Sequence, residues 1–329
     1  MISVNDIEKE LDIKLTSNQK LYFQNRQFDK YVLPASNIQI STLLNKFNRP
    51  AVYYNLCQLI SKFKKSWDFA TFTYFLLKNK KSKDFEIYEK IFQDIPKISS
   101  VREYSKSYVA DYLINIFDNL KLLHPKSLLD IGCGNCIMTR DLGIALNLKK
   151  EDIYGADIPE EFEQKWIETR PKDINFVLIN NNKLKFNRKF DLITCMMVLH
   201  HVPVEYLNQY LQDIYNLLNN DGLFIIKEHD CFNATDYIIA DIEHSLYIVQ
   251  EAFALQNDKK LSEKSKQDIS QLNISYKDRF TWRVLIQRIG FKCIYENPFD
   301  YNLTNTYSPN RAYLAIFQKK IRIDKNNNM

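Results

Sequence analysis

The sequence predicts an α/β fold, a doubly wound and mostly parallel sheet, preceded by a mainly helical amino-terminal region. After Pro125, short apolar segments alternate with helix-like segments, a pattern typical of parallel strands joined by crossover helices. All six glycines lie in this part of the chain, most of them beside a predicted strand. Residues 1–98 contain no glycine, and their apolar residues often recur at three- and four-residue spacings, which indicates helices.

The chain has 329 residues, of which 45% are hydrophobic and 26% charged. It is therefore long enough to bury one sizeable core and a second, smaller one. We expect a helical domain over residues 1–98, an α/β domain over residues 99–320 and a polar tail over residues 321–329. The amino terminus lacks the apolar stretch of a signal peptide, and no apolar run is long enough to span a membrane. We expect a cytoplasmic protein with no membrane segment, and the sequence does not indicate its oligomeric state.

Positive charge is concentrated at the amino-terminal end. Residues 1–98 hold 16 Lys and Arg against 10 Asp and Glu, whereas the rest of the chain holds 29 against 30. A basic domain rich in aromatic residues is compatible with binding a polyanion such as RNA. The alternative is a helical domain with an aromatic core and solvated lysines, and the sequence alone favours this alternative.

The α/β region contains seven predicted strands, with helical segments predicted between most of them. The apolar runs of the predicted strands have the length of ordinary strands. Gly290 directly follows the last predicted helix, and a glycine commonly ends a helix at this position. The predicted strands are Ser127–Ile131, Ile153–Asp157, Phe176–Ile179, Asp191–Met196, Leu223–Lys227, Phe291–Tyr295 and Arg311–Gln318, and the predicted helices are Tyr104–Leu123, Glu205–Leu218 and Thr281–Ile289.

The segment LLDIGCGNC contains the strongest motif. It predicts a buried strand that runs into a tight turn at Gly132 and Gly134 and then into a helix. Small residues at such a turn let the backbone approach a ligand at the amino end of the helix. Asp130, two residues before the first glycine, suits a ligand that carries an ammonium group better than it suits a pyrophosphate.

Two polar residues follow the next two strands. Asp157 ends the second strand, 23 residues after Gly134, where a carboxylate can hold both hydroxyls of a ribose. Asn180 follows the third strand, from which its side chain could reach an adenine amino group. Together with the glycine turn, these residues predict a site for an adenosine-containing ligand.

In their order and spacing, these motifs resemble those of the class I S-adenosylmethionine-dependent methyltransferases, over roughly residues 100–320. The resemblance implies a seven-stranded sheet whose last strand is antiparallel, and S-adenosylmethionine as the cofactor. Cys136 is a departure, because the family often has a third glycine there, and this puts the packing of the loop in question. By residue-wise carry-over, Asp130, Gly132 and Gly134 would contact the methionine part, Asp157 the ribose and Asn180 the adenine.

Histidines gather where the fourth and fifth strands end, the edge that faces the ligand crevice in an open parallel sheet. A histidine is the usual base for removing a proton from an oxygen or amine acceptor. We expect His229 to be this base, oriented by Glu228 or Asp230, with His201 as second choice. A histidine at the position of His200 usually packs inward, so the sequence favours a structural role for His200 over a chemical one.

Metal-assisted chemistry is a weaker alternative. His201, Glu228, His229 and His244 could together bind a divalent cation. Cys133 and Cys136 have the spacing of zinc ligands, but no second pair completes a site. We therefore expect no metal.

These observations predict an enzyme that transfers a methyl group to an oxygen or nitrogen acceptor. RNA is favoured over protein as the acceptor, and a small molecule is the alternative. A second hypothesis is a non-catalytic subunit with the same fold, although a decayed site has little reason to retain both carboxylates and both glycines. A dehydrogenase is disfavoured because Ile137 stands where the third glycine of its dinucleotide motif would be.

Overall fold

The structure, a computed structural model, describes residues 4–14, 33–34, 66–67, 98–158, 170–180, 183–232, 240, 275–297 and 312–319. The chain divides into two compact units. The first comprises Met1–Val101, His229–Thr281 and Pro298–Tyr313, and the second comprises Arg102–Glu228, Trp282–Asn297 and Leu314–Met329.

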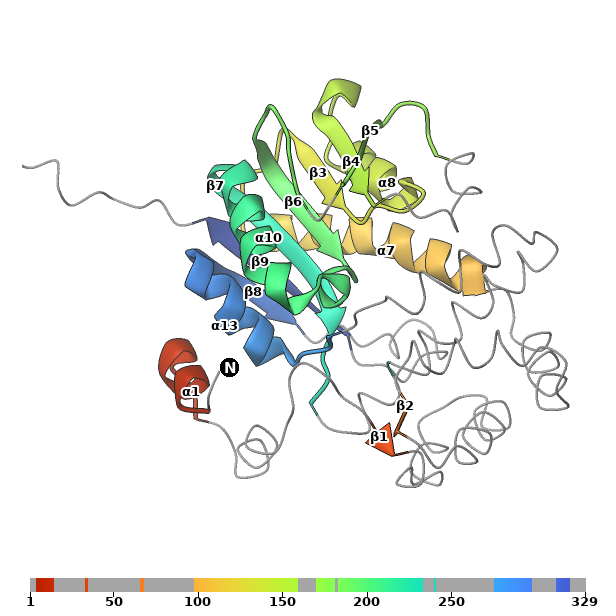
Figure 1. Cartoon of the computed structure of the whole chain (residues 1–329). Coiled ribbons are helices and arrows are strands. Elements are labelled where there is room, and N and C mark those ends of the chain that lie inside the picture. The colour runs from red at the N-terminus through yellow and green to blue at the C-terminus, as the bar shows by residue number, and fades with distance from the viewer. Residues whose placement is uncertain are drawn as a thin grey trace, which may run out of the picture. The chain divides into compact units, whose positions relative to one another are not determined.

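A seven-stranded sheet forms the centre of the α/β fold (Figure 1). Its strand order is β5-β4-β3-β6-β7-β9-β8. The neighbours from β5 to β7 are parallel, whereas β8 and β9 are antiparallel to each other. The predicted fold class is confirmed. The strands are β3 (Leu128–Ile131), β4 (Ile153–Asp157), β5 (Asn175–Leu178), β6 (Phe190–Met196), β7 (Leu218–His229), β8 (Phe291–Asn297) and β9 (Ala312–Lys319).

Successive strands are added on one side of β3 as far as β5 and on its other side from β6 onward, so a topological switch point lies between the parallel strands β3 and β6. Helix α8 (Ile137–Ala145) connects β3 to β4, and α10 (Val204–Leu217) connects β6 to β7 on the other side of β3. Because such crossovers are right-handed, the two helices cover opposite faces of the sheet. Figure 1 shows α10 in front of the sheet and α7 (Ile98–Asn119) behind it. Ligands of open α/β sheets bind at this kind of switch point, beyond the carboxyl ends of the strands.

Two element boundaries differ most from the predictions. Helix α7 begins at Ile98, six residues before the predicted start at Tyr104. Strand β7 begins at Leu218, five residues before the predicted start at Leu223. Leu218 pairs with Phe190 and Leu223 with Leu192, so the extra residues between them form an irregularity within the strand.

The amino-terminal region is described only in part. Helix α1 (Val4–Leu11) buries Ile7 and Leu11, and β1 (Leu33–Pro34) pairs antiparallel with β2 (Ser66–Trp67). Most of residues 1–98 and all of residues 321–329 lie outside the described residues. The predicted helical domain, its boundary and the polar tail therefore stay predictions. None of the helices in the described ranges combines the length and the apolar character that crossing a membrane requires.

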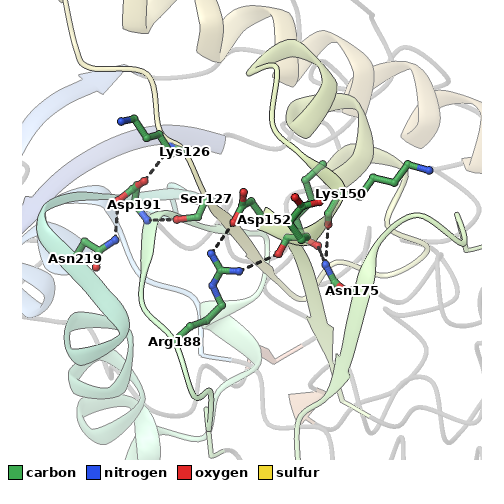
Figure 2. A network of polar contacts seen from close by, with 10 residues as sticks. Lys126, Ser127, Lys150, Asp152, Asn175, Arg188, Asp191 and Asn219 are labelled. Atoms are coloured by element: carbon green, nitrogen blue, oxygen red, sulfur yellow. Dashed lines mark hydrogen bonds and ion pairs between the residues drawn. The ribbon is translucent and has the colours of Figure 1, made fainter.

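Polar contacts join the loops at the amino-terminal ends of the strands (Figure 2). The carboxylate of Asp191 accepts hydrogen bonds from the backbone N–H of Lys126 at 2.9 Å and from Nδ2 of Asn219 at 2.7 Å. Arg188 donates to the carboxylate of Asp152 at 2.8 Å. These contacts fix the edge of the sheet opposite to the one where the carboxyl ends of β3, β4 and β6 meet.

Helix α13 (Arg279–Ile289) begins with an aspartate cap. Asp278 is fully buried, and its carboxylate accepts the backbone N–H of Thr281 at 2.9 Å and the hydroxyl of the same residue at 2.7 Å. An aspartate at this position satisfies a donor of the first turn that has no partner within the helix.

We expect Asp278→Ala to lower the free energy of unfolding by about 1–2 kcal/mol, because the cap is lost at a buried site. Asp278→Asn, which retains a capping oxygen, should recover most of this loss. Chemical denaturation of the three proteins tests this, and equal stability of the alanine variant and the parent would contradict the assignment.

Candidate active site

The loop after β3 turns through three residues in the left-handed conformation. Gly132, Gly134 and Cys136 have φ values of 70°, 56° and 59°, and Cys136 directly precedes α8. The backbone N–H of Gly132 donates to the carbonyl of Ala156 at the end of β4, at 2.7 Å. The loop is therefore held against the carboxyl end of the neighbouring strand, as its motif predicts.

Close packing leaves no room for a side chain at Gly132. A Cβ built on this residue would lie 2.2 Å from Cγ2 of Val198, in the turn after β6. A Cβ built on Gly155 of β4 would lie 2.9 Å from the Sγ atoms of both Cys133 and Cys136. The glycine in β4 thus makes space for the two thiols, which explains how the loop accommodates Cys136 where the family often has glycine.

The two cysteines are buried free thiols. Their Sγ atoms lie 3.3 Å apart, which is longer than a disulfide bond of about 2.05 Å. Burial, followed by the hydrogen bond with Cys136, raises the pKa of Cys133 well above its usual value. Within the ranges that the structure describes, no three His, Cys, Asp or Glu residues gather as a metal site would require.

Asp157 joins β4 to the glycine loop. Its Oδ2 accepts the backbone N–H of Gly134 at 2.7 Å, and its Oδ1 accepts the backbone N–H of Ile158 at 2.8 Å. The structure thus brings together the glycine and the carboxylate that the sequence places 23 residues apart. The side chain is half-buried, so part of it faces solvent.

Arg170 contacts the same glycine of the loop on its carbonyl side. Its Nε donates to the carbonyl of Gly134 at 3.0 Å, and its guanidinium carbon lies 3.6 Å from the ring centroid of Phe176. Arg170 was not predicted as a site residue, because a single arginine ahead of a strand forms no recognisable pattern.

Asp130 ties the base of the loop to two other elements. Thr139 of α8 donates its hydroxyl to Oδ2 at 2.6 Å, and Thr194 of β6 donates its hydroxyl to Oδ1 at 2.7 Å. The aspartate is 1% exposed. Its predicted contact with a ligand ammonium stays a prediction, and the two threonines were not foreseen because isolated threonines carry no distinctive signal.

Asn180 is exposed after β5. Its carbonyl accepts the backbone N–H of Lys183 at 3.2 Å, which forms a short bridge. Leu178, at the end of β5, is the register partner of Asp157. Asn180 therefore follows the same edge of the sheet as Asp157, and its contact with adenine stays a prediction.

Glu228 has partners other than the one predicted. Its Oε2 lies 2.6 Å from Nδ1 of His200, and both side chains are fully buried. Successive side chains of a strand project to opposite faces. The expectation that Glu228 orients His229 stays a prediction. His201 is half-buried, and its ring centroid lies 4.1 Å from that of His200.

His229 and Asp230 lie beside a polar segment that the sequence analysis did not single out. The ring of Tyr276 meets that of His229 edge to face, with centroids 5.1 Å apart. Asp230 accepts the backbone N–H of Arg279 at 2.9 Å, which ties it to the start of α13. Lys277 is buried, and its Nζ donates to the hydroxyl of Ser275 at 2.5 Å. His244, the fourth member of the hypothetical metal cluster, lies outside the described residues.

We expect Gly132→Ala to destabilise the protein by at least about 1–2 kcal/mol, because an L-residue is strained at this positive φ. The contact of the new Cβ with Val198 adds to this cost. Adding Val198→Ala should recover the contribution of the contact but not that of the strain, and denaturation of the single and double variants separates the two. Unchanged stability of Gly132→Ala would contradict the loop geometry.

The raised pKa of Cys133 lowers its thiolate fraction at pH 8, and burial blocks access to the thiol. We therefore expect iodoacetamide to alkylate Cys133 at least about tenfold more slowly in the folded protein than in the unfolded chain. Peptide mass spectrometry over time measures both rates. Equal rates would show that the thiol is accessible.

Comparison with known proteins identifies relatives of part of the chain. It is 25% identical to a sphingolipid C9-methyltransferase of Komagataella phaffii over 42% of this chain and 29% of that protein. It is 30% identical to a ubiquinone biosynthesis O-methyltransferase of Glaesserella parasuis over 35% of this chain and 50% of that protein. The matches thus span between about a third and a half of the length of these relatives.

Solved structures of similar fold include an S-adenosylmethionine-dependent methyltransferase from Clostridium acetobutylicum, with 14% identity and a TM-score of 0.44 over 73% of this chain and 98% of that chain. Another is the 1,6-didemethyltoxoflavin-N1-methyltransferase of Burkholderia thailandensis, with 14% identity and a TM-score of 0.43 over 66% and 79% of the two chains.

The family described as "Methyltransferase domain" matches residues 101–296, which is more than half of the chain. This range contains the glycine loop, Asp157 and the strands that position them. The chain therefore belongs to the methyltransferase domain family, which confirms the resemblance that its motifs show to class I S-adenosylmethionine-dependent methyltransferases.

Proposed function

We propose that this chain binds S-adenosylmethionine at the glycine loop and transfers its methyl group to a small-molecule or lipid acceptor. The observation that carries the proposal is the 2.7 Å hydrogen bond from the backbone of Gly134 to Asp157. It places a bent backbone and a carboxylate side by side at the carboxyl ends of β3 and β4, next to the switch point where such sheets bind ligands. Membership of the methyltransferase domain family supports the same conclusion.

The residues of this edge fit the chemistry of the cofactor. The left-handed turn at Gly132 and Gly134 brings the backbone of the loop to the carboxyl end of β4, where the ligand would approach it. Asp157 would accept hydrogen bonds from the ribose hydroxyls, Asn180 would bind the adenine amino group, and Asp130 would favour the ammonium of the methionine part. When bound, S-adenosylmethionine supplies an electrophilic methyl group on a sulfonium.

The proposed task of His229 is to accept the proton of an oxygen or nitrogen acceptor at a ring nitrogen. It is the last residue of β7, it is 2% exposed, and the ring of Tyr276 packs against its ring edge to face. A base in this role contributes about 10²–10⁴-fold to the rate. His201, half-buried in the turn after β6, is the second choice for the same role.

The names of the two curated relatives favour a small or lipid acceptor. One is named for a sphingolipid and the other for ubiquinone biosynthesis, and neither name refers to RNA. The expectation of an RNA acceptor depended on residues 1–98, most of which lie outside the described residues. RNA therefore has no support from the comparisons, and a cytoplasmic location stays a prediction.

Two measurements test the proposal in sequence. Isothermal titration with S-adenosylhomocysteine should show binding by the purified chain. Incubation with methyl-labelled cofactor and separate pools of lipid, metabolite, RNA and protein should then label the lipid or metabolite pool. Label in the RNA or protein pool would contradict the proposed acceptor, and absence of binding would support a non-catalytic subunit.

The residue proposed to bind the cofactor and the residue proposed to accept the proton should respond differently to substitution. We expect Asp157→Ala to weaken binding of S-adenosylhomocysteine by about tenfold to a hundredfold, the loss typical of a hydrogen bond to a charged group. His229→Ala should leave this affinity unchanged and lower kcat by about 10²–10⁴-fold.

Asp152→Ala is the matched control, because Asp152 is also a half-buried carboxylate but lies at the opposite edge of the sheet (Figure 2). It should change neither the affinity nor kcat by more than about twofold. The reverse pattern, with binding lost in His229→Ala and kept in Asp157→Ala, would overturn the assignment of roles.

A further inference from the structure

The carboxylate of Glu228 organises the turn after β6. Its Oε1 accepts the backbone N–H groups of Val198 and Leu199, at 3.0 and 2.7 Å, and its Oε2 lies 2.6 Å from Nδ1 of His200. Three consecutive residues of the turn are therefore bound to one side chain at the end of β7.

This pair is costly to bury. Both side chains have no exposed surface, and a carboxylate without water requires several hydrogen bonds to offset its desolvation. Replacing such a pair by apolar residues of similar size often preserves or increases stability. Stability alone is therefore a weak reason for a glutamate and a histidine at these positions.

The turn that Glu228 binds is also the turn that contacts the glycine loop. A Cβ built on Gly132 would lie only 2.2 Å from Cγ2 of Val198, so Val198 fills the space beside this glycine. Further backbone bonds fix the turn, from Met197 N–H to the carbonyl of Lys227 at 2.7 Å and from His201 N–H to the carbonyl of Val198 at 2.9 Å. The position of the Val198 side chain thus depends on the end of β7.

We propose that Glu228 and His200 form a positioning pair that acts through Val198 on the glycine loop. The carboxylate fixes the backbone of Val198, and the imidazole of His200 fixes the carboxylate. Val198 then holds Gly132 in its left-handed conformation, which keeps the N–H of Gly134 directed at Asp157. Neither member of the pair touches the ligand, and the effect on cofactor affinity rests on the proposed function.

The test compares His200→Leu, which keeps an apolar volume but removes the donor, with His200→Asn, whose Nδ2 lies near the position of the imidazole Nδ1. Asp191→Asn is the control, because Asp191 is a hydrogen-bonded carboxylate of β6 at the opposite edge of the sheet. Should His200→Leu fail to fold, Glu228→Gln replaces it. The glutamine amide keeps an oxygen that can accept the backbone N–H groups of the turn, but it removes the carboxylate oxygen that faces His200.

Two readouts are measured beside the thermal midpoint. Hydrogen exchange of the peptide that contains residues 132–136 reports on the loop without any ligand, because the N–H groups of Cys133 and Gly134 are hydrogen-bonded to Ala156 and Asp157. Titration with S-adenosylhomocysteine reports on the affinity for the cofactor product.

We expect His200→Leu to raise the exchange rate of this peptide and to weaken binding by about tenfold, the effect of losing a hydrogen bond to a charged group. In His200→Asn the exchange rate and the affinity should stay within about threefold of the parent, and in Asp191→Asn within about twofold, even where the thermal midpoint falls.

Loop exchange in His200→Leu equal to that in the parent, or equal to that in Asp191→Asn, would overturn the proposal. Faster exchange in a protein whose parent form binds no S-adenosylhomocysteine would support the positioning pair and refute the proposed function.

Discussion

The hydrogen bond between the backbone of Gly134 and the carboxylate of Asp157 joins the ends of two neighbouring parallel strands. It forms only because the loop after β3 bends back over β4, and that bend requires Gly132 to adopt a left-handed conformation with no side chain. Gly155 of β4 must also lack a side chain, because two thiols of the loop occupy the space beside it. Three glycines and one carboxylate thus determine the shape of the proposed cofactor site.

The end of β7 shows how neighbouring residues of one strand acquire different tasks. Glu228 is directed at the turn after β6, where its carboxylate accepts backbone N–H groups and faces His200. His229 projects from the other face of the strand and meets Tyr276. The alternation of a strand therefore separates a residue that holds the glycine loop in place from a residue proposed to accept the proton of the acceptor.

The sheet and the approach of Gly134 to Asp157 were predictable from sequence, because parallel strands bring their carboxyl ends to one edge and the glycine motif marks that edge. The partners of Asp130 and the hydrogen bond from Arg170 to Gly134 were not predictable from sequence. Single threonines and arginines become distinctive only when tertiary packing brings them to a site. The bonds from Glu228 to the turn after β6 were not predicted either, because no sequence pattern marks a contact between residues 29 or 30 positions apart. The contact of Tyr276 with His229 joins positions far apart in sequence, which periodicity does not reveal.

A crystal structure of the chain with S-adenosylhomocysteine tests the position of the proposed cofactor site most directly. We expect the ribose beside the carboxylate of Asp157 and the amino acid part of the ligand over Gly132 and Gly134, at the carboxyl ends of β3 and β4. A ligand bound at the opposite edge of the sheet, near Asp191 and Arg188, or with no contact to the glycine loop, would contradict the proposed cofactor site.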